Sequence, residues 1–301
     1  MYPAAFHYHR AATIEEAVSA LKELGEEARP LAGGQSLIPL MKLRLARPAA
    51  LVDLSFISGL SGMERNNGAV RIGALARHAE IADSEIAAAI PIVHDCAAGI
   101  ADVQVRNLGT LGGSLAEADP AGDWGPVLLT LSTELHSVGP NGRRRIPLSE
   151  FFQDAYTTAL EPAELLQSVT IQLPAGNSGG AYVAFKRCAP VYASASAAVQ
   201  LTRAERQNHC QEIKIYLGCV GLLPVHAEAA EKELRGGELT EKNIDRAAEA
   251  AMHAAEPQSD MRGSAEYKKI LIRSLVKRAI LAAVRRSRGE QVKVEHEYAG
   301  R

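Results

Sequence analysis

The sequence predicts an α+β fold, because three patterns along its 301 residues separate strands from helices. Residues 6–54 follow the order strand, helix, strand, loop, strand. Beyond residue 180 come three strand-like runs, and beyond residue 238 come two long segments with helical spacing. A stretch of small turn residues at 174–180 divides these patterns and predicts a domain boundary there.

Start and stop signals define the N-terminal helix. Thr13 and Glu16 form a capping box, and Gly25 provides the stop. Apolar residues between Ile14 and Leu24 share one face, as expected of a helix that packs on a sheet. Strands are expected around Phe6 and Tyr8, at Ala28–Leu31 and at Ala50–Leu54, with a second helix or turn starting near Ser36.

The middle of the chain mixes short strands and helices. Val70–Ile72 is strand-like, whereas His78–Ala82 and Ile86–Ala98 have Ala-rich helical faces. Asn107–Asp123 contains several glycines and little periodicity, so we expect a long structured loop. Gly139–Gly142 lies between two strand-like runs and predicts a hairpin turn.

The C-terminal part changes from strands to helices. Strands are expected at Ala181–Lys186, Ala193–Leu201 and Glu212–Val220, and helices at Leu239–Ala255 and Ser264–Arg286. The polar residues that follow are expected to fray.

These patterns divide the chain into four parts. We expect a small N-terminal βαβ domain at 1–57, a second α+β domain at 58–176, a C-terminal domain with a three-stranded sheet and helical bundle at 177–288, and a tail at 289–301.

Composition excludes several classes of protein. With 47% hydrophobic and 23% charged residues and a net charge of -2, the chain is typical of a globular protein, and no strong field favours nucleic acid. No apolar run is long enough for a transmembrane helix, and Met1–Arg10 lacks a secretory signal, so a cytoplasmic location is expected. The four cysteines are far apart, which disfavours disulfides, structural zinc and iron–sulfur clusters in this chain, and we expect no bound metal.

The residues that could carry chemistry lie in two glycine-rich segments. In Ala32–Ser36, consecutive glycines let backbone N–H groups point into one concavity without a Cβ in the way, and Ser36 adds a hydroxyl. A tight strand-to-helix turn without a ligand is the alternative. Thr110–Ser114 repeats these features in the second predicted domain. Two such loops favour a ligand long enough to bridge them, such as a dinucleotide, over two unrelated turns.

Other signatures are missing from the sequence. No G-x-G-x-x-G follows the first strand, which disfavours a Rossmann site. The P-loop and the G-x-S-x-G elbow are also missing, which disfavours an NTPase and an α/β-hydrolase.

At these two loops the sequence resembles the FAD-binding medium subunit of molybdenum hydroxylases, the family of aerobic carbon monoxide dehydrogenase, with related flavin segments in xanthine dehydrogenase and aldehyde oxidase. The resemblance runs from about Phe6 to Arg286. The matching stretches are 31–37, 106–114, 118–123, 151–152, 157–158, 165–166 and 185–187. Two positions depart from the common pattern: Gln35 stands where His is common, and Pro190-Val191 replaces Gly-Asp.

The resemblance implies the PCMH-type FAD-binding fold and non-covalent FAD. It implies that both loops wrap the diphosphate and ribityl, that Asp123 accepts a hydrogen bond from a cofactor hydroxyl, and that Ile100 packs on the adenine. Leu166 and Lys186 are implied near the isoalloxazine, and Tyr192 either shields the ring or is a core tyrosine at a strand edge. The implied contacts are Leu31, Ala32, Gly33, Gly34, Gln35, Ser36, Leu37, Ile38, Ile100, Thr110, Leu111, Gly112, Gly113, Ser114, Asp123, Leu166, Lys186 and Tyr192.

The resemblance also implies a role in electron transfer, with no catalytic side chain in this chain. A small subunit with [2Fe–2S] clusters and a large molybdopterin subunit would be partners, in a dimer of heterotrimers, and FAD would pass electrons to an external acceptor. The complex would be cytoplasmic, or peripheral to the inner membrane through its acceptor. The alternatives are a stand-alone flavin oxidoreductase and a flavin-less scaffold or maturation protein.

Gly33→Val or Gly112→Val is expected to abolish FAD binding while leaving the fold largely intact.

Overall fold

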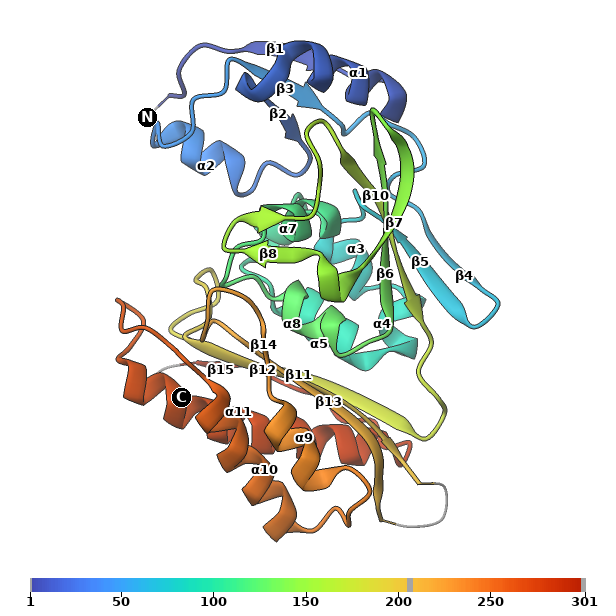
Figure 1. Ribbon diagram of the computed structural model, residues 1–301, viewed down its shortest axis with the longest axis vertical. Coiled ribbons are helices and arrows are strands. Elements are labelled where there is room, and N and C mark those ends of the chain that lie inside the picture. Colours follow the sequence, from blue (N-terminus) through green and yellow to red (C-terminus); the bar gives the residue numbers. More distant parts are fainter. Residues whose placement is uncertain (1, 205–207, 299–301) are drawn as a thin grey trace. The chain divides into compact units, whose positions relative to one another are not determined.

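The computed structural model describes residues 2–204 and 208–298 (Figure 1). Contacts within the chain divide it into two compact units. Unit 1 comprises Met1–Glu80, Val103–Ala118 and Thr133–Ile171, and unit 2 comprises Ile81–Asp102, Asp119–Ser132 and Gln172–Arg301. Each unit therefore draws on segments that are distant in sequence, and the four-part domain division stays a prediction.

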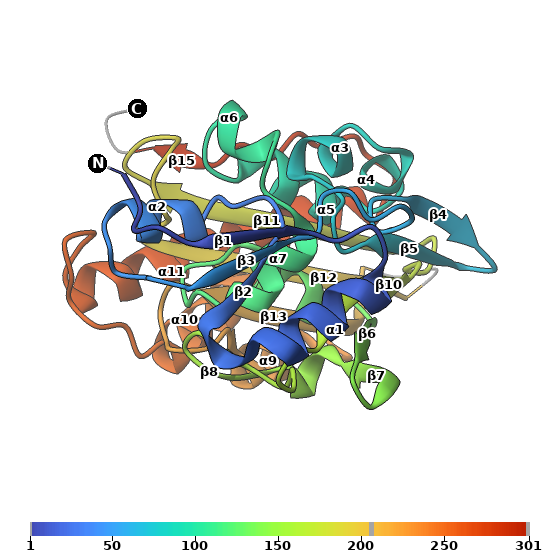
Figure 2. The same cartoon turned by 90° about the horizontal axis from the view of Figure 1, so that it is seen from above.

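Unit 1 begins with a three-stranded parallel sheet of order β1-β3-β2, and Figure 2 shows its three strands side by side. The helix α1 packs on it through Ile14, Leu21 and neighbouring apolar residues. Thr13 caps the helix as predicted, since its Oγ1 accepts from the Glu16 amide at 3.1 Å, and Glu16 Oε2 reaches back to the Ala12 amide at 2.8 Å, one residue before the expected partner. The elements are β1 (His7–Arg10), α1 (Ile14–Leu24), η1 (Gly25–Glu27), β2 (Ala28–Leu31), α2 (Leu37–Lys42) and β3 (Ala50–Asp53).

A second sheet of unit 1 has the order β4-β5-β10-β6-β7. The predicted hairpin is confirmed, because β6 and β7 pair antiparallel up to Gly139 opposite Gly142. The strands are β4 (Met63–Asn66), β5 (Ala69–Gly73), β6 (Thr133–Gly139), β7 (Gly142–Pro147) and β10 (Leu165–Gln172), and the short elements η2 (Leu148–Glu150), β8 (Phe152–Asp154) and β9 (Thr157–Thr158) lie between β7 and β10 in the chain.

The expectation of a long loop at Asn107–Asp123 is wrong, because part of this segment is helical. The helix α7 (Leu111–Glu117) begins at Thr110, whose hydroxyl accepts from the Gly113 amide. A short helix, α6 (Val103–Arg106), precedes it. Two glycines in the first turn hide the apolar spacing by which a helix is normally identified.

Unit 2 is built on a five-stranded sheet of order β14-β13-β12-β11-β15. The helices α9, α10 and α11 cover one face, and α5 and α8 lie on the other (Figure 1). The three predicted strands are present, and two short strands extend the sheet beyond the three expected. The elements are α4 (Glu85–Ala89), α5 (Pro91–Gly99), α8 (Trp124–Leu129), β11 (Ser178–Lys186), β12 (Ala195–Arg203), β13 (Cys210–Gly218), β14 (Val225–His226), α9 (Glu228–Leu234), α10 (Glu241–Ala254), α11 (Ala265–Arg286) and β15 (Glu297–Tyr298), while α3 (His78–Ala82) runs across the boundary between the two units.

The expectation of a frayed tail is wrong for the part that the structure describes. β15 pairs in parallel with β11, with Glu297 opposite Phe185 and Tyr298 opposite Lys186. Residues 299–301 of the predicted tail lie outside the described residues.

Across residues 2–204 and 208–298, no helix is both long enough and apolar enough to cross a bilayer. The same residues contain no group of three or more His, Cys, Asp or Glu side chains placed to hold a metal ion.

Candidate functional site

The first glycine loop connects β2 to α2 in unit 1. All residues from Leu31 to Ile38 are partly buried. Gly34 has a φ of 70°, a conformation that other residues adopt at a cost. The side chain of Gln35 turns back and donates from Nε2 to the Gly33 carbonyl at 3.1 Å, so it braces the loop.

This loop presents a run of unpaired backbone donors. Within the described residues, the amides of Gly33, Gly34, Gln35, Ser36 and Leu37 donate no hydrogen bond to protein atoms. Ser36 precedes α2 but makes no side-chain capping bond, so its hydroxyl is also available. Successive free amides in a turn form an anion-binding concavity. The loop therefore has the donor set that a diphosphate needs.

Gly33 allows close packing between the two loops, a role that the sequence did not predict. A Cβ at this position would lie 2.1 Å from the Leu108 carbonyl oxygen and 2.8 Å from the Gly109 Cα. Its lack of a side chain therefore lets the first loop pack directly against the backbone that leads into the second loop. The expectation that Gly33→Val leaves the fold largely intact is wrong, since a valine would collide with main-chain atoms.

The second glycine loop uses its amides within unit 1. Leu111 N donates to Ala76 O at 3.0 Å, and Gly112 N donates to Ala74 O at 2.8 Å. Gly113 N and Ser114 N both donate to Thr110, to Oγ1 and to the carbonyl. All four amides are paired, so the similarity between the loops does not extend to their hydrogen bonds. What the second loop can offer a ligand is the hydroxyl groups of Thr110 and Ser114.

The glycines of the second loop also differ from each other. A Cβ on Gly112 would lie 2.6 Å from the Ala74 Cβ and 2.8 Å from its oxygen, so Gly112→Val would disturb the fold as well. A Cβ on Gly113 would meet only the Thr110 hydroxyl, at 2.8 Å, and the Ala32 Cβ, at 3.7 Å. Gly113 and Ala32 therefore bring the two loops side by side in unit 1. Leu166, on β10 of the same unit, is buried and paired with Ser137.

Two more predicted residues, Asp123 and Lys186, meet in unit 2. The side chain of Lys186 is only 1% exposed, and its Nζ lies 3.9 Å from Asp123 Oδ1. It donates to the Gly99 carbonyl at 2.7 Å. Asp123 Oδ1 accepts from the Tyr182 hydroxyl at 2.5 Å, and burial together with the nearby Asp123 carboxylate raises the pKa of Tyr182 well above its usual value. Because a carboxylate accepts several hydrogen bonds, Asp123 keeps capacity for a ligand hydroxyl.

The remaining predicted residues of unit 2 are less enclosed. Ile100 follows α5 directly and is partly buried. Tyr192 is 46% exposed, with the Arg262 guanidinium carbon 5.6 Å from its ring centroid. An exposed aromatic of this kind does not fit the alternative of a core tyrosine.

Comparison with known proteins shows the family to which the chain belongs. Residues 4–174 match the family model described as the FAD binding domain in molybdopterin dehydrogenase, and residues 180–283 match that of the CO dehydrogenase flavoprotein C-terminal domain. The chain belongs to the FAD-binding medium-chain family of the molybdopterin dehydrogenases. The predicted family, the α+β fold class and FAD as cofactor are thereby confirmed, and the chain is an oxidoreductase component.

Individual members of this FAD-binding medium-chain family are similar along almost their whole length. The carbon monoxide dehydrogenase medium chain of Afipia carboxidovorans is 41% identical, with 96% of this chain and 100% of the relative covered. The 6-hydroxypseudooxynicotine dehydrogenase complex subunit alpha of Paenarthrobacter nicotinovorans is 37% identical, with 98% and 100% covered. In the solved structure of reconstituted CO dehydrogenase from Oligotropha carboxidovorans, a chain 40% identical to this one has a TM-score of 0.91, covering 95% of this chain and 100% of that one.

In this medium chain, sequence reasoning missed a buried polar cluster in unit 2. Arg286 on α11 binds both carboxylate oxygens of Asp95 on α5, at 2.6 and 2.9 Å, and Asp95 Oδ2 also accepts from the Tyr182 amide at 3.1 Å. Burial raises the pKa of Asp95 against the opposing effect of Arg286, and burial together with the Lys186 cation lowers the pKa of His296. One signal was present in the sequence: Asp95 falls among buried apolar residues of an Ala-rich helix, where a carboxylate requires a partner.

Proposed function

We propose that this chain is the FAD-carrying electron-transfer subunit of a molybdenum-containing hydroxylase or dehydrogenase. Electrons would reach it from [2Fe–2S] clusters of a partner subunit and leave to an external acceptor. The observation that carries the proposal is the run of unpaired amides from Gly33 to Leu37 beside the second glycine loop. A concavity lined by backbone donors suits the negative charge of a diphosphate.

The first loop is the proposed diphosphate cradle. The amides from Gly33 to Leu37 and the Ser36 hydroxyl would donate to the diphosphate oxygens. Leu31, Ala32 and Ile38 would form the walls of the cradle. Thr110 and Ser114 would contribute hydroxyl donors, while Leu111, Gly112 and Gly113 would supply packing surface, because their amides are already paired.

The family resemblance supports the other proposed contacts. Ile100 would pack on the adenine, Asp123 would accept from a cofactor hydroxyl, and Leu166, Lys186 and Tyr192 would lie at the isoalloxazine. FAD, when bound, supplies the redox chemistry, while the protein supplies binding, orientation and electrostatics. A buried cation such as Lys186 would stabilise negative charge on the reduced ring.

We further propose partners and a location. A relative is a carbon monoxide dehydrogenase medium chain and another is a subunit of a 6-hydroxypseudooxynicotine dehydrogenase complex, which supports assembly with a small [2Fe–2S] subunit and a large molybdopterin subunit. The arrangement would be a dimer of heterotrimers in the cytoplasm, with the substrate selected by the large subunit.

The test is FAD binding by the purified chain, measured by flavin absorbance and by titration of the apoprotein. In Gly34→Ala, the φ of 70° no longer suits the residue, so the amides of Gln35 and Ser36 reorient. Losing one hydrogen bond to a charged group costs about 1.5–3 kcal/mol, and we expect at least about tenfold weaker FAD binding. The Cβ would meet only side-chain atoms, Ile38 Cδ1 at 2.7 Å and Leu31 Cδ1 at 3.2 Å, which can shift, so unit 1 should stay folded.

Gly68→Ala is the matched control. Gly68 lies in unit 1, has a φ of 79° and has open space where a Cβ would project, so it experiences the same backbone strain away from the loop. Equal FAD affinity in Gly34→Ala and Gly68→Ala would refute the cradle. A wild-type chain that binds no FAD would instead favour the scaffold alternative.

A further inference from the structure

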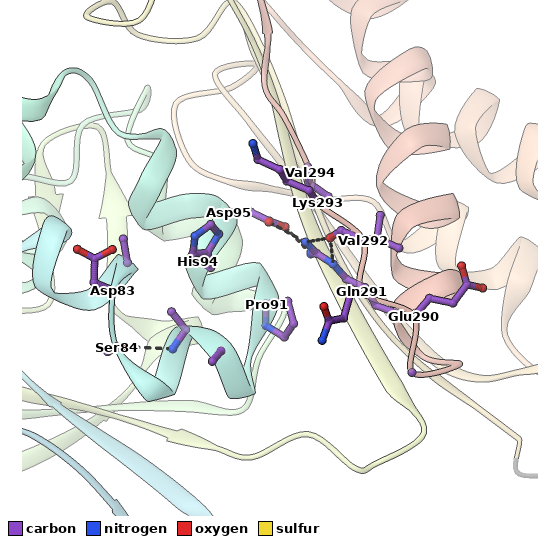
Figure 3. Close-up of a pocket in the computed structure, with 15 residues that line it drawn as sticks. Asp83, Ser84, Pro91, His94, Asp95, Glu290, Gln291, Val292, Lys293 and Val294 are labelled. Carbon is purple, nitrogen blue, oxygen red and sulfur yellow. Dashed lines mark hydrogen bonds and ion pairs between the residues drawn. The ribbon is translucent and has the colours of Figure 1, made fainter.

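The C-terminal segment at residues 289–298, here called the strap, returns to unit 2 beyond the end of the family match at residue 283. Arg286, which is paired with Asp95, also donates to the Val292 carbonyl from Nε at 3.1 Å and from Nη2 at 2.7 Å. Figure 3 shows Asp95 facing the strap residues Val292, Lys293 and Val294. A pocket of ≈ 740 Å³ separates the strap from much of α4 and α5. The attachment of the strap to α5 therefore depends on few side chains.

His296 provides the second attachment, and both of its ring nitrogens are used. Nδ1 accepts from the Ala184 amide on β11 at 3.1 Å, and Nε2 lies 3.0 Å from the Asp95 carbonyl on α5. A carbonyl cannot donate, so Nε2 carries the proton and Nδ1 does not. The neutral ring thus links α5 to β11.

His296 also packs against Gly99 at the end of α5. A Cβ on Gly99 would lie 1.7 Å from His296 Nε2, so the imidazole occupies the space that a side chain would fill. The Gly99 carbonyl accepts from Lys186 Nζ at 2.7 Å. Lys186 is two residues beyond Ala184 on β11, and therefore His296 and Lys186 bridge the same two elements side by side.

The two bridging side chains also connect through Tyr182 and Asp123. The His296 and Tyr182 rings meet edge to face at 5.6 Å, and Tyr182 donates to Asp123, the carboxylate beside Lys186. A change in the spacing of α5 and β11 would therefore move the Gly99 carbonyl away from Lys186 Nζ. The ammonium would then keep Asp123 as its nearby partner.

We infer that His296 is a positioning residue that holds Lys186 in place through Gly99 and thereby helps to set the reduction potential of the bound flavin. This inference rests on the proposed function, which places Lys186 at the isoalloxazine. Charges interact strongly in a buried site of low dielectric, so a small displacement of the ammonium changes the stabilisation of the reduced cofactor.

The experiment compares flavin midpoint potentials in the FAD-loaded chain. His296→Ala removes both bridging bonds, and we expect a more negative potential, by about 30 mV if the preference for reduced over oxidised FAD weakens tenfold. His296→Gln can accept from Ala184 and donate to Asp95, so it should restore much of the potential. Lys293→Ala is the matched control, since this strap lysine has an 81% exposed side chain and its ion-pair partner, Glu295, lies within the strap.

A double-mutant cycle tests whether His296 acts through Lys186. In a Lys186→Met background, His296→Ala should shift the potential little further, because the cation it positions is gone. Full additivity of the two shifts would overturn the inference. The inference would also be overturned if Lys186→Met shifted the midpoint potential and His296→Ala did not. If Lys186→Met left the midpoint potential unchanged, the proposed place of Lys186 at the isoalloxazine would be refuted.

If His296→Ala retains too little FAD for a potential to be measured, the crystal structure of the variant decides. A Lys186 Nζ to Gly99 O distance that stays near 2.7 Å would overturn the inference, and a broken bond would support it.

Discussion

The two glycine loops of unit 1 look alike in sequence and differ in what their amides do. In the first loop, the amides from Gly33 to Leu37 are unpaired among the described residues. In the second, the amides from Leu111 to Ser114 are all paired with Ala74, Ala76 or Thr110. Similar composition therefore serves two purposes. The first loop leaves its donors free for the proposed ligand, and the second uses its donors to hold the fold together.

The largest expected effect is a loss of stability on substitution of Gly33, which tests the packing between the two loops without FAD. Gly33→Val places atoms against the Leu108 carbonyl, and overpacking of this kind costs about 1–3 kcal/mol or more. We expect a loss of about 3 kcal/mol in the free energy of unfolding of the apoprotein, measured with urea. Gly62→Val is the control, since a Cβ there meets nothing within 4 Å. Equal stability of the two variants would mean that the loops do not need their close approach.

Two smaller effects should fall on different quantities, stability in the second loop and FAD affinity in the first. Thr110→Ala removes a helix cap and should lower the free energy of unfolding by about 0.5–2 kcal/mol, with a smaller effect on FAD affinity. Ser36→Ala removes no capping bond, so stability should stay unchanged while FAD binding weakens by about 0.5–1.5 kcal/mol, which is roughly two- to twelvefold in Kd. Thermal unfolding of the apoprotein and flavin titration measure the two quantities.

Thr110→Ser retains the capping oxygen and is the control for the second loop. If Ser36→Ala destabilised the apoprotein as much as Thr110→Ala does, the assignment of separate roles to the two loops would fail.

Local signals in the sequence predicted local structure well. The Thr13 capping box begins α1, and the turn at Gly139–Gly142 joins β6 to β7, because both features depend on residues within a few positions of each other. The helix α7 was missed because two glycines at its start resemble a loop. Gly112 is explained by Ala74, which is distant in sequence and leaves no room for a Cβ there, whereas Gly113 lies against Thr110 and Ala32.

The site was predicted in part for the same reason. Sequence identified the glycine loops, whereas the pairing of the second loop's amides depends on carbonyls near Ala74 that no motif includes. Asp95 itself gave one signal, but its partners could not be identified, because Arg286 lies 191 positions away and His296 was assigned to a fraying tail. Buried polar partners of this kind are set by tertiary contacts and not by any local pattern.

The short strand β15 has a consequence for how the chain folds. Its pairing with β11 brings together residues that are 112 positions apart, and closing so long a loop is entropically costly before other contacts form. Docking of β15 is therefore expected late in folding. Until then, the outer edge of β11 presents unpaired backbone groups on which another chain could add a strand. The last residues of the strap would thus act against aggregation, and a bulky fusion placed next to Tyr298 would be expected to lower the yield of folded protein.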